Sequence, residues 1–194
     1  FVNFLLTENP KISYNYLQPS IGLMNKIIHS VDLTKIYGEK ETSVTALDNI
    51  NVEFKENEFT AIMGPSGSGK STLLHCLAGL DRPTSGQIFL KEEDISTLND
   101  KQLTKIRRDS FGFVFQAFNL IPTLTAEENI TLPASIAGRK PDMDWVKQVV
   151  ETVDIGDRLS HRPNELSGGQ QQRVAAARAC LLYTSDAADE VLGV

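Results

Sequence analysis

The fold that we expect for this chain is decided by one stretch, Gly64-Pro65-Ser66-Gly67-Ser68-Gly69-Lys70-Ser71-Thr72. It fits the pattern G-x-x-x-x-G-K-[ST]. Three glycines, at positions 64, 67 and 69, let successive backbone N–H groups point at one anion. Lys70 would then reach the β- and γ-phosphates of a nucleotide, and the Ser71 hydroxyl would ligate Mg²⁺. The stretch therefore predicts a nucleotide-phosphate loop.

The residues on either side of this loop predict a strand-loop-helix unit. Residues 59–63, Phe-Thr-Ala-Ile-Met, are typical of a short buried strand, and residues 72–78 are typical of a helix that ends near Gly79. This order would place the positive end of the helix dipole under the phosphates. A chance match in a glycine-rich turn is the simpler alternative. The loop alone also leaves several nucleotide-binding classes open, among them small-molecule kinases of the guanylate type.

A second motif, Leu166-Ser167-Gly168-Gly169-Gln170, lies about a hundred residues further on. Ser167 can cap a helix whose N3 residue is Gln170, and the two glycines keep the first turn free of side chains. A bare helix N-terminus is itself a site for anions. In isolation the motif would be an ordinary capped helix. Beside the phosphate loop it favours a second contact to a nucleotide.

Together these motifs make residues 31–179 resemble the ATP-binding cassette (ABC) family. Within that family the chain is most similar to the ATPase subunits of macrolide-export and lipoprotein-release transporters. The further matching segments lie at residues 79–86, 113–122 and 124–129. The resemblance implies an α/β fold: a P-loop NTPase (RecA-like) core with an antiparallel β lobe and a helical subdomain, truncated here at its C-terminal side.

The resemblance also implies roles for residues outside the phosphate loop. Tyr37 would stack on adenine, and Gln116 would sense Mg²⁺ and the attacking water. Ser167, Gly168 and Gly169, with Gln170, would contact the γ-phosphate held by the loop of a second copy. ATP and Mg²⁺ are thus the expected cofactors, with Ser71 and Gln116 as metal ligands. Without the family, Tyr37 would be an ordinary strand tyrosine and Gln116 an ordinary loop residue.

Composition narrows the possible partners. The 194 residues carry a net charge of −6, which argues against nucleic acid as the main partner. No apolar run approaches the roughly 20 residues that span a bilayer. Any membrane role would therefore come through a separate subunit. The family resemblance implies that this partner is an integral membrane permease, with this protein bound peripherally on the cytoplasmic face of the membrane. Two cysteines, Cys76 and Cys180, indicate no disulfide framework.

The rest of the chain shows alternating strand and helix patterns. Strands are expected over 27–33 and 45–54, around a polar turn at 38–43, and 87–90 would join them in an antiparallel lobe. Helices are expected over 100–108, after a capping box formed by Thr125 and Glu128, and after Pro141. In that last helix a set of apolar residues shares one face, typical of core packing: Trp145, Val146, Val149, Val150 and Val153.

Both ends differ in character from the middle. Residues 1–23 are expected to be either translated upstream sequence or a short disordered extension, and 24–179 an incomplete ABC ATPase domain. Residues 180–194 resemble a transposon mosaic end and library adapter in translation, the alternative being a genuinely divergent end. Asp189-Glu190 imitates the family's catalytic pair, but residues 184–188 lack the β-branched run of a buried strand. Glu190 is therefore no secure catalytic base, and we expect this chain not to hydrolyse ATP, whatever its parent does.

The expected function of the parent is ATP hydrolysis by a dimer that drives a bacterial export or extraction transporter. An alternative of another class is an ABC ATPase that transports nothing and acts as a mechanical adaptor for cell-wall or division machinery. The guanylate-type kinase is disfavoured by the segment 166–170, which such kinases do not need.

Overall fold

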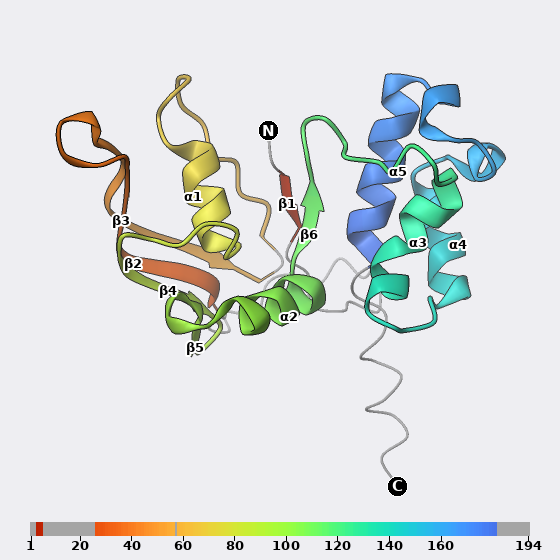
Figure 1. The fold of residues 1–194 in the computed structure, drawn as a ribbon. Helices are drawn as coiled ribbons and strands as arrows, with labels where there is room; N and C mark the ends of the chain where they lie inside the picture. The colour runs from red at the N-terminus through yellow and green to blue at the C-terminus, as the bar shows by residue number, and fades with distance from the viewer. Residues whose placement is uncertain (1–2, 6–25, 57, 182–194) are drawn as a thin grey trace, which may run out of the picture. The chain divides into compact units, whose positions relative to one another are not determined.

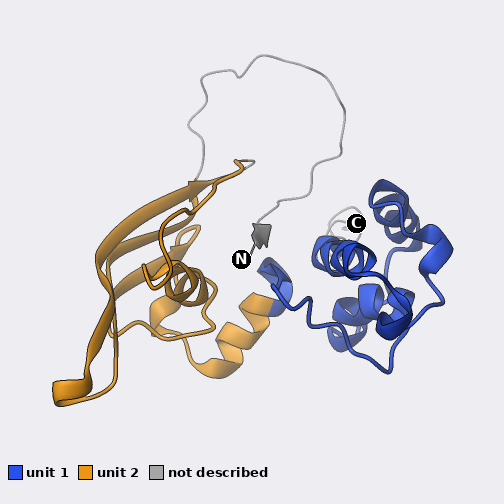
Figure 2. Cartoon of the chain, turned by 90° about the horizontal axis from the view of Figure 1, so that it is seen from above, with its two compact units in different colours: residues 1–5, 108–194 blue, residues 6–107 orange. Residues whose placement is uncertain are grey.

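The computed structural model describes residues 3–5, 26–56 and 58–181. The chain divides into two compact units, residues 6–107 and residues 108–194 with 1–5 (Figure 2). Each unit is described by itself. Asp189 and Glu190, and most of the predicted end segments 1–23 and 180–194, lie outside the described residues.

The unit of residues 6–107 is built on a four-stranded sheet (Figure 1). Its strands are β2 (Lys26–Tyr37), β3 (Val44–Lys55), β4 (Ser85–Leu90) and β5 (Glu93–Asp94), in the order β3-β2-β4-β5. All neighbouring strands are antiparallel. The predicted antiparallel lobe is thus confirmed, although β2 continues past its predicted end at residue 33. A short 3₁₀ helix, η1 (Lys40–Thr42), lies in the turn between β2 and β3.

One helix, α1 (Lys70–Leu77), packs against β2 and β3 (Figure 1). It buries Leu73, Cys76 and Leu77, and the sheet buries Ile28 and Leu33. Burial of such side chains is the main favourable term in folding, at about 1.5–3 kcal/mol for each large apolar residue. The helix begins two residues before its predicted start, and its position is set by the sheet beneath it.

The predicted strand over residues 59–63 is wrong for this structure. The segment takes no regular secondary structure, and Phe59 and Met63 are 94% and 87% exposed. A buried strand needs neighbours that accept and donate its backbone hydrogen bonds. None of the strands that the structure describes pairs with residues 58–63, so the apolar pattern alone does not make a strand there.

The unit of residues 6–107 ends with η2 (Ile95–Thr97) and most of α2 (Asp100–Ser110), which confirms the helix predicted over 100–108. The other unit holds β6 (Gly112–Val114), which pairs antiparallel with β1 (Asn3–Leu5). Its main helices are α3 (Ala126–Ile136), α4 (Met143–Thr152) and α5 (Gly168–Cys180), with the short turns η3 (Gly156–Arg158) and η4 (Pro163–Glu165) between α4 and α5.

Capping residues set where these helices begin. Thr125 and Glu128 form the predicted capping box of α3. The N-cap of α4 is Asp142, whose carboxylate accepts from the N–H groups of Asp144 and Trp145. Pro141 therefore precedes the helix and does not open it, because a side-chain acceptor one residue later satisfies the free N–H groups.

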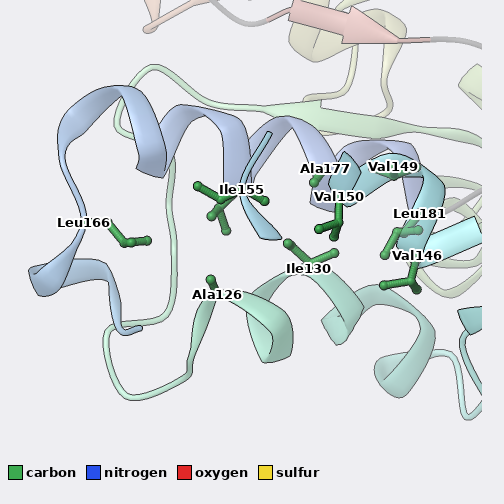
Figure 3. Packing of buried hydrophobic residues seen from close by; sticks show 10 residues of the cluster. Ala126, Ile130, Val146, Val149, Val150, Ile155, Leu166, Ala177 and Leu181 are labelled. Carbon is green, nitrogen blue, oxygen red and sulfur yellow. The ribbon is translucent and has the colours of Figure 1, made fainter. Parts of the chain in front are cut away.

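The three helices enclose one apolar core (Figure 3). Figure 3 shows Ile130 of α3 pointing toward Val146 and Val150 of α4. The predicted core face of α4 is confirmed, with Trp145 and Val153 partly buried at its edges. The buried side chains of this core are Ala126, Ile130, Val146, Val149, Val150, Ile155, Leu166, Val174, Ala177 and Leu181.

Candidate functional site

The backbone of the phosphate loop depends on glycine. Gly67 and Gly69 have φ values of 79° and 83°, in the left-handed region that side chains disfavour. At Gly69, which is the N-cap of α1, a Cβ atom would lie 2.4 Å from the carbonyl oxygen of Ala46. Only glycine therefore allows the loop to pass this close to β3 and turn directly into the helix.

This turn leaves a row of backbone donors available. Within the described part of the chain, the N–H groups of Gly67, Gly69, Lys70 and Ser71 make no hydrogen bond. They lie at the N-terminus of α1, where the helix dipole is positive. A Cβ built at Gly67 meets nothing within 4 Å. The loop therefore offers converging donors and open space, which fits an anion such as a phosphate group.

The side chains of the loop add charge and an oxygen ligand. The Lys70 ammonium lies 2.8 Å from Gly64 O, 2.6 Å from Pro65 O and 3.2 Å from Ser68 Oγ, so its charge is held inside the loop. Ser71 is exposed on the first turn of α1. Its hydroxyl is a hard oxygen donor of the kind that Mg²⁺ accepts. No cluster of three or more His, Cys, Asp or Glu side chains suited to a metal occurs among the residues described.

Tyr37 lies at the end of β2, in the same unit as the phosphate loop. Its ring is 41% exposed, and its hydroxyl donates to Asp81 Oδ2 at 2.5 Å. This hydrogen bond is the main reason why the pKa of Tyr37 lies above its usual value, with burial adding to it and a hydrogen bond with Thr72 of the loop opposing it. The structure therefore brings the predicted aromatic residue to the predicted loop.

Sequence reasoning missed the two residues that hold Tyr37 in place. Lys35 Nζ lies 2.6 Å from Asp81 Oδ1 and 4.8 Å from the centre of the Tyr37 ring. Burial raises the pKa of Asp81, but the hydrogen bonds from Lys35 and Tyr37 outweigh it, and the net pKa is lowered. The only sequence signal for this contact is the place of Asp81 in the short turn after α1, four residues beyond the end of the helix.

Gln116 lies in the other unit, two residues after β6, with an exposed side chain. The loop that follows it takes an unusual path, because Phe118 and Asn119 both have positive φ values, of 59° and 47°. Arg178 of α5 donates to the carbonyl oxygens of these two residues, at 2.7 Å and 2.8 Å. A side chain of the helix after the second motif thereby fixes the loop after Gln116.

The second motif forms the predicted capping box. Ser167 Oγ accepts from the N–H of Gln170 at 3.3 Å, and Gln170 Oε1 accepts from the N–H of Ser167 at 2.8 Å. Gly168 and Gly169 are exposed, and a Cβ at either would meet nothing within 4 Å. The N-terminus of α5 is thus an exposed, uncovered surface with the positive end of a helix behind it.

The sequence model of the ABC transporter family matches residues 47–185. This chain belongs to the ABC transporter family. The same fold occurs in a solved ABC cassette, MJ0796 of Methanocaldococcus jannaschii. The dimeric structure of MJ0796 aligns with a TM-score of 0.73 and 45% identity over 80% of this chain and 69% of that one. A second structure of MJ0796, described as a post-hydrolysis state bound to ADP and Pi, aligns equally well.

Other relatives of this ABC chain are named as ATP-binding proteins. It is 51% identical to an ABC transporter ATP-binding protein of Thermotoga maritima, over 80% of this chain and 68% of the relative. It is 47% identical to the lipoprotein-releasing ATP-binding protein LolD of Geobacter metallireducens (82% and 72% covered). The macrolide export ATP-binding/permease protein MacB of Marinobacter nauticus is also 47% identical, but this chain spans only 24% of it. In the described residues of the ABC chain, no helix has the length and apolar character to cross a membrane.

Proposed function

We propose that the parent protein is the ATP-binding and ATP-hydrolysing subunit of an ABC transporter of the export or extraction type, and that this chain carries its nucleotide-binding residues. The observation that carries the proposal is the phosphate loop, with its free N–H groups at the start of α1 and the enclosed Lys70 ammonium. Such a loop binds the phosphates of a nucleotide, and Tyr37, held beside it, supplies a ring for the base.

Each part of the loop has a role in this proposal. The N–H groups of Gly67, Gly69 and Lys70 donate to phosphate oxygens, and the ammonium of Lys70 moves from its own loop carbonyls to the β- and γ-phosphates. Pro65, Ser66 and Ser68 shape the loop around the anion. Because the ammonium is already held inside the loop, it has only a short distance to move when ATP binds.

The residues present also fit Mg²⁺. In the unit of residues 6–107 the Ser71 hydroxyl would hold it, and the family resemblance is the support for Gln116 of the other unit as a further ligand; both side chains offer hard oxygen atoms. Held there, Mg²⁺ would supply positive charge that neutralises the phosphates. Thr72 follows Ser71 in the first turn of α1, near enough to the hydroxyl of Tyr37 to oppose the rise in the pKa of that residue.

Ser167, Gly168, Gly169 and Gln170 are proposed to act across a dimer. Their exposed helix N-terminus suits the γ-phosphate held by the loop of a second copy, so that two copies enclose two nucleotides. The dimeric structures of the related MJ0796 support this assembly. The proposed membrane partner is a separate integral permease, to which this protein would bind on the cytoplasmic face of the membrane. The name of the MacB relative, an ATP-binding/permease protein, supports a link between such a domain and a permease.

The proposal is tested by calorimetric titration of the full chain with Mg-ATP. Lys70→Ala removes the charge that faces the phosphates and should weaken binding at least about 100-fold, because hydrogen bonds to charged groups contribute roughly 1.5–3 kcal/mol each. Lys101→Ala, an equal change of charge at an exposed position of α2, is the control and should leave affinity unchanged. An equal affinity of the Lys70 variant and the unaltered chain would refute the nucleotide site.

A further inference from the structure

The exposed ring of Tyr37 is held by a contact that spans 44 residues. Tyr37 donates its hydroxyl proton to one carboxylate oxygen of Asp81, at 2.5 Å. Lys35 donates to the other oxygen of the same carboxylate, at 2.6 Å. Both oxygens of Asp81 are therefore engaged, and the tyrosine hydroxyl has one fixed acceptor.

Lys35 completes the arrangement from the side of the ring. Its ammonium lies 4.8 Å from the ring centre and also donates to the carbonyl oxygen of Arg82, at 2.7 Å. The Lys35 side chain is only 13% exposed, so this charge is largely shielded from water. A cation over an aromatic face is attracted by the ring quadrupole. The ring of Tyr37 is thus held at its hydroxyl and at one face.

The segment that carries Asp81 is hydrogen-bonded to α1, the helix that follows the phosphate loop, and to β2. Asp81 follows α1, and its N–H donates to His75 O of that helix. Three residues later, Thr84 bonds to β2 twice: its N–H donates to Thr34 O at 2.8 Å, and its hydroxyl accepts from Ile36 N–H at 2.9 Å. The helix that starts at Lys70 and the strand that ends at Tyr37 are therefore joined through one short turn.

We propose that Asp81, supported by Lys35, is a positioning residue that fixes the ring of Tyr37 as the platform on which the nucleotide base stacks. This inference rests on the proposed function, because it assumes that the loop binds ATP. A tyrosine that is already immobilised loses less side-chain freedom when the base binds, and preorganisation of this kind strengthens binding. The rigid link to α1 also sets the separation between base and phosphates.

The experiment compares two probes in the full chain, Mg-ATP and Mg-tripolyphosphate, by calorimetry. Asp81→Ala should weaken ATP binding about three- to tenfold, the range expected when one side chain must be ordered on binding. Tripolyphosphate has no base, so its affinity should stay the same. Asp81→Asn keeps an oxygen that can accept from the Tyr37 hydroxyl and should restore part of the ATP affinity.

The link to Tyr37 is tested by a double-mutant cycle. In a Tyr37→Ala background, Asp81→Ala should have no further effect on ATP binding, since the ring that it positions is gone. The control is Asp94→Ala, which removes a carboxylate bonded to Ser96 and Gln87 in the same sheet but does not touch Tyr37. It should leave the affinities for both probes unchanged.

The outcomes separate this inference from the proposed function. Equal weakening of the binding of both probes by Asp81→Ala would show a merely structural role. So would a loss of ATP affinity on Asp81→Ala that is as large in the Tyr37→Ala background as in the unaltered chain. Either result would overturn the inference alone. Unchanged ATP affinity in Asp81→Ala, with the loss in Lys70→Ala intact, would also overturn only the inference. An unaltered chain that binds neither probe would refute the proposed function and the inference with it.

Discussion

Arg178 and Phe118 are 60 residues apart in the sequence, and the guanidinium of the first donates to the carbonyl oxygen of the second at 2.7 Å. A second donor of the same side chain contacts Asn119 O at 2.8 Å. Both acceptors belong to residues with positive φ values. Helix α5, which begins within the second motif, therefore holds the loop after Gln116 in a conformation that its own residues disfavour.

Arg178→Ala should lower the free energy of unfolding by about 3 kcal/mol, since two charge-assisted hydrogen bonds are lost and two carbonyl groups lose their donor. Urea unfolding monitored by circular dichroism measures the change. Arg173→Ala is the matched control on the same helix, because Arg173 is half exposed in its contact with Asp154 and should contribute no more than about 1 kcal/mol. Similar losses of unfolding free energy in the two variants would show that Arg178 does not hold the loop after Gln116.

Ser167→Ala should prevent formation of an ATP-dependent dimer while leaving ATP binding by the monomer intact. The proposed reason is that Ser167 contacts the nucleotide of the partner copy and not its own. Size-exclusion chromatography with and without Mg-ATP measures dimer formation, and calorimetry measures binding.

The control for this experiment is Thr125→Ala. Thr125 caps α3 with the same capping box, so both variants should lose about 1 kcal/mol of stability. Only the Ser167 variant should lose the dimer. Loss of ATP binding by the monomer in Ser167→Ala would instead place the second motif in the same site as Lys70.

Asn129→Asp should strongly destabilise the helical unit. The Asn129 amide is fully buried and donates to the carbonyl oxygens of Ile121, Leu124 and Thr125, at 3.1, 3.2 and 2.9 Å. A carboxylate in its place would face three acceptors, at a cost of about 3 kcal/mol or more near pH 7. Asn164→Asp, at an exposed position, should change stability by less than about 0.5 kcal/mol.

The same substitution has a defined pH dependence. Burial against carbonyl groups should raise the pKa of the new carboxyl in the folded state. A raised pKa means that stability is recovered as the pH falls below the folded-state pKa, where the group is protonated and can donate again. Urea unfolding near pH 7 and near pH 5 should therefore show a smaller deficit at the lower pH. An equal deficit at both values would contradict this account.

Cys76 should react with iodoacetamide far more slowly than Cys180 in the folded protein. Burial raises the pKa of the Cys76 thiol to about 11, and the side chain has no exposed surface. Burial also raises the pKa of Cys180, but this residue is partly exposed. Mass spectrometry of the single-cysteine variants Cys76→Ala and Cys180→Ala gives the two rates, which should become equal in urea.

The raised pKa of Cys76 also predicts how stability changes with pH. Because the folded state favours the neutral thiol, its contribution is complete below the unfolded-state pKa of about 8.5 and declines as the pH rises toward about 11. The unfolding free energy of Cys76→Ala should lack this decline. A decline of the same size in the variant would assign the effect to other groups.

Much of the site could be predicted because its geometry is local. The capping boxes at Thr125 and Ser167 join residues three positions apart, so the side chain and its acceptor meet wherever the helix starts. The positive φ values of Gly67 and Gly69 are equally local, because they belong to the turn that the phosphate loop makes into α1. For these features the amino-acid sequence alone determined the structure.

Other features depend on contacts between distant segments, and only the tertiary structure decided them. The apolar residues 59–63 indicate a strand, but a strand also needs a neighbour to bond with, and no described strand supplies one. Asp81 reaches Tyr37, and Arg178 reaches Phe118, only because packing brings together backbones that lie 44 and 60 residues apart. Local hydrogen bonds are set by neighbouring residues, whereas these pairings depend on how the sheet and helices pack, which no short pattern encodes.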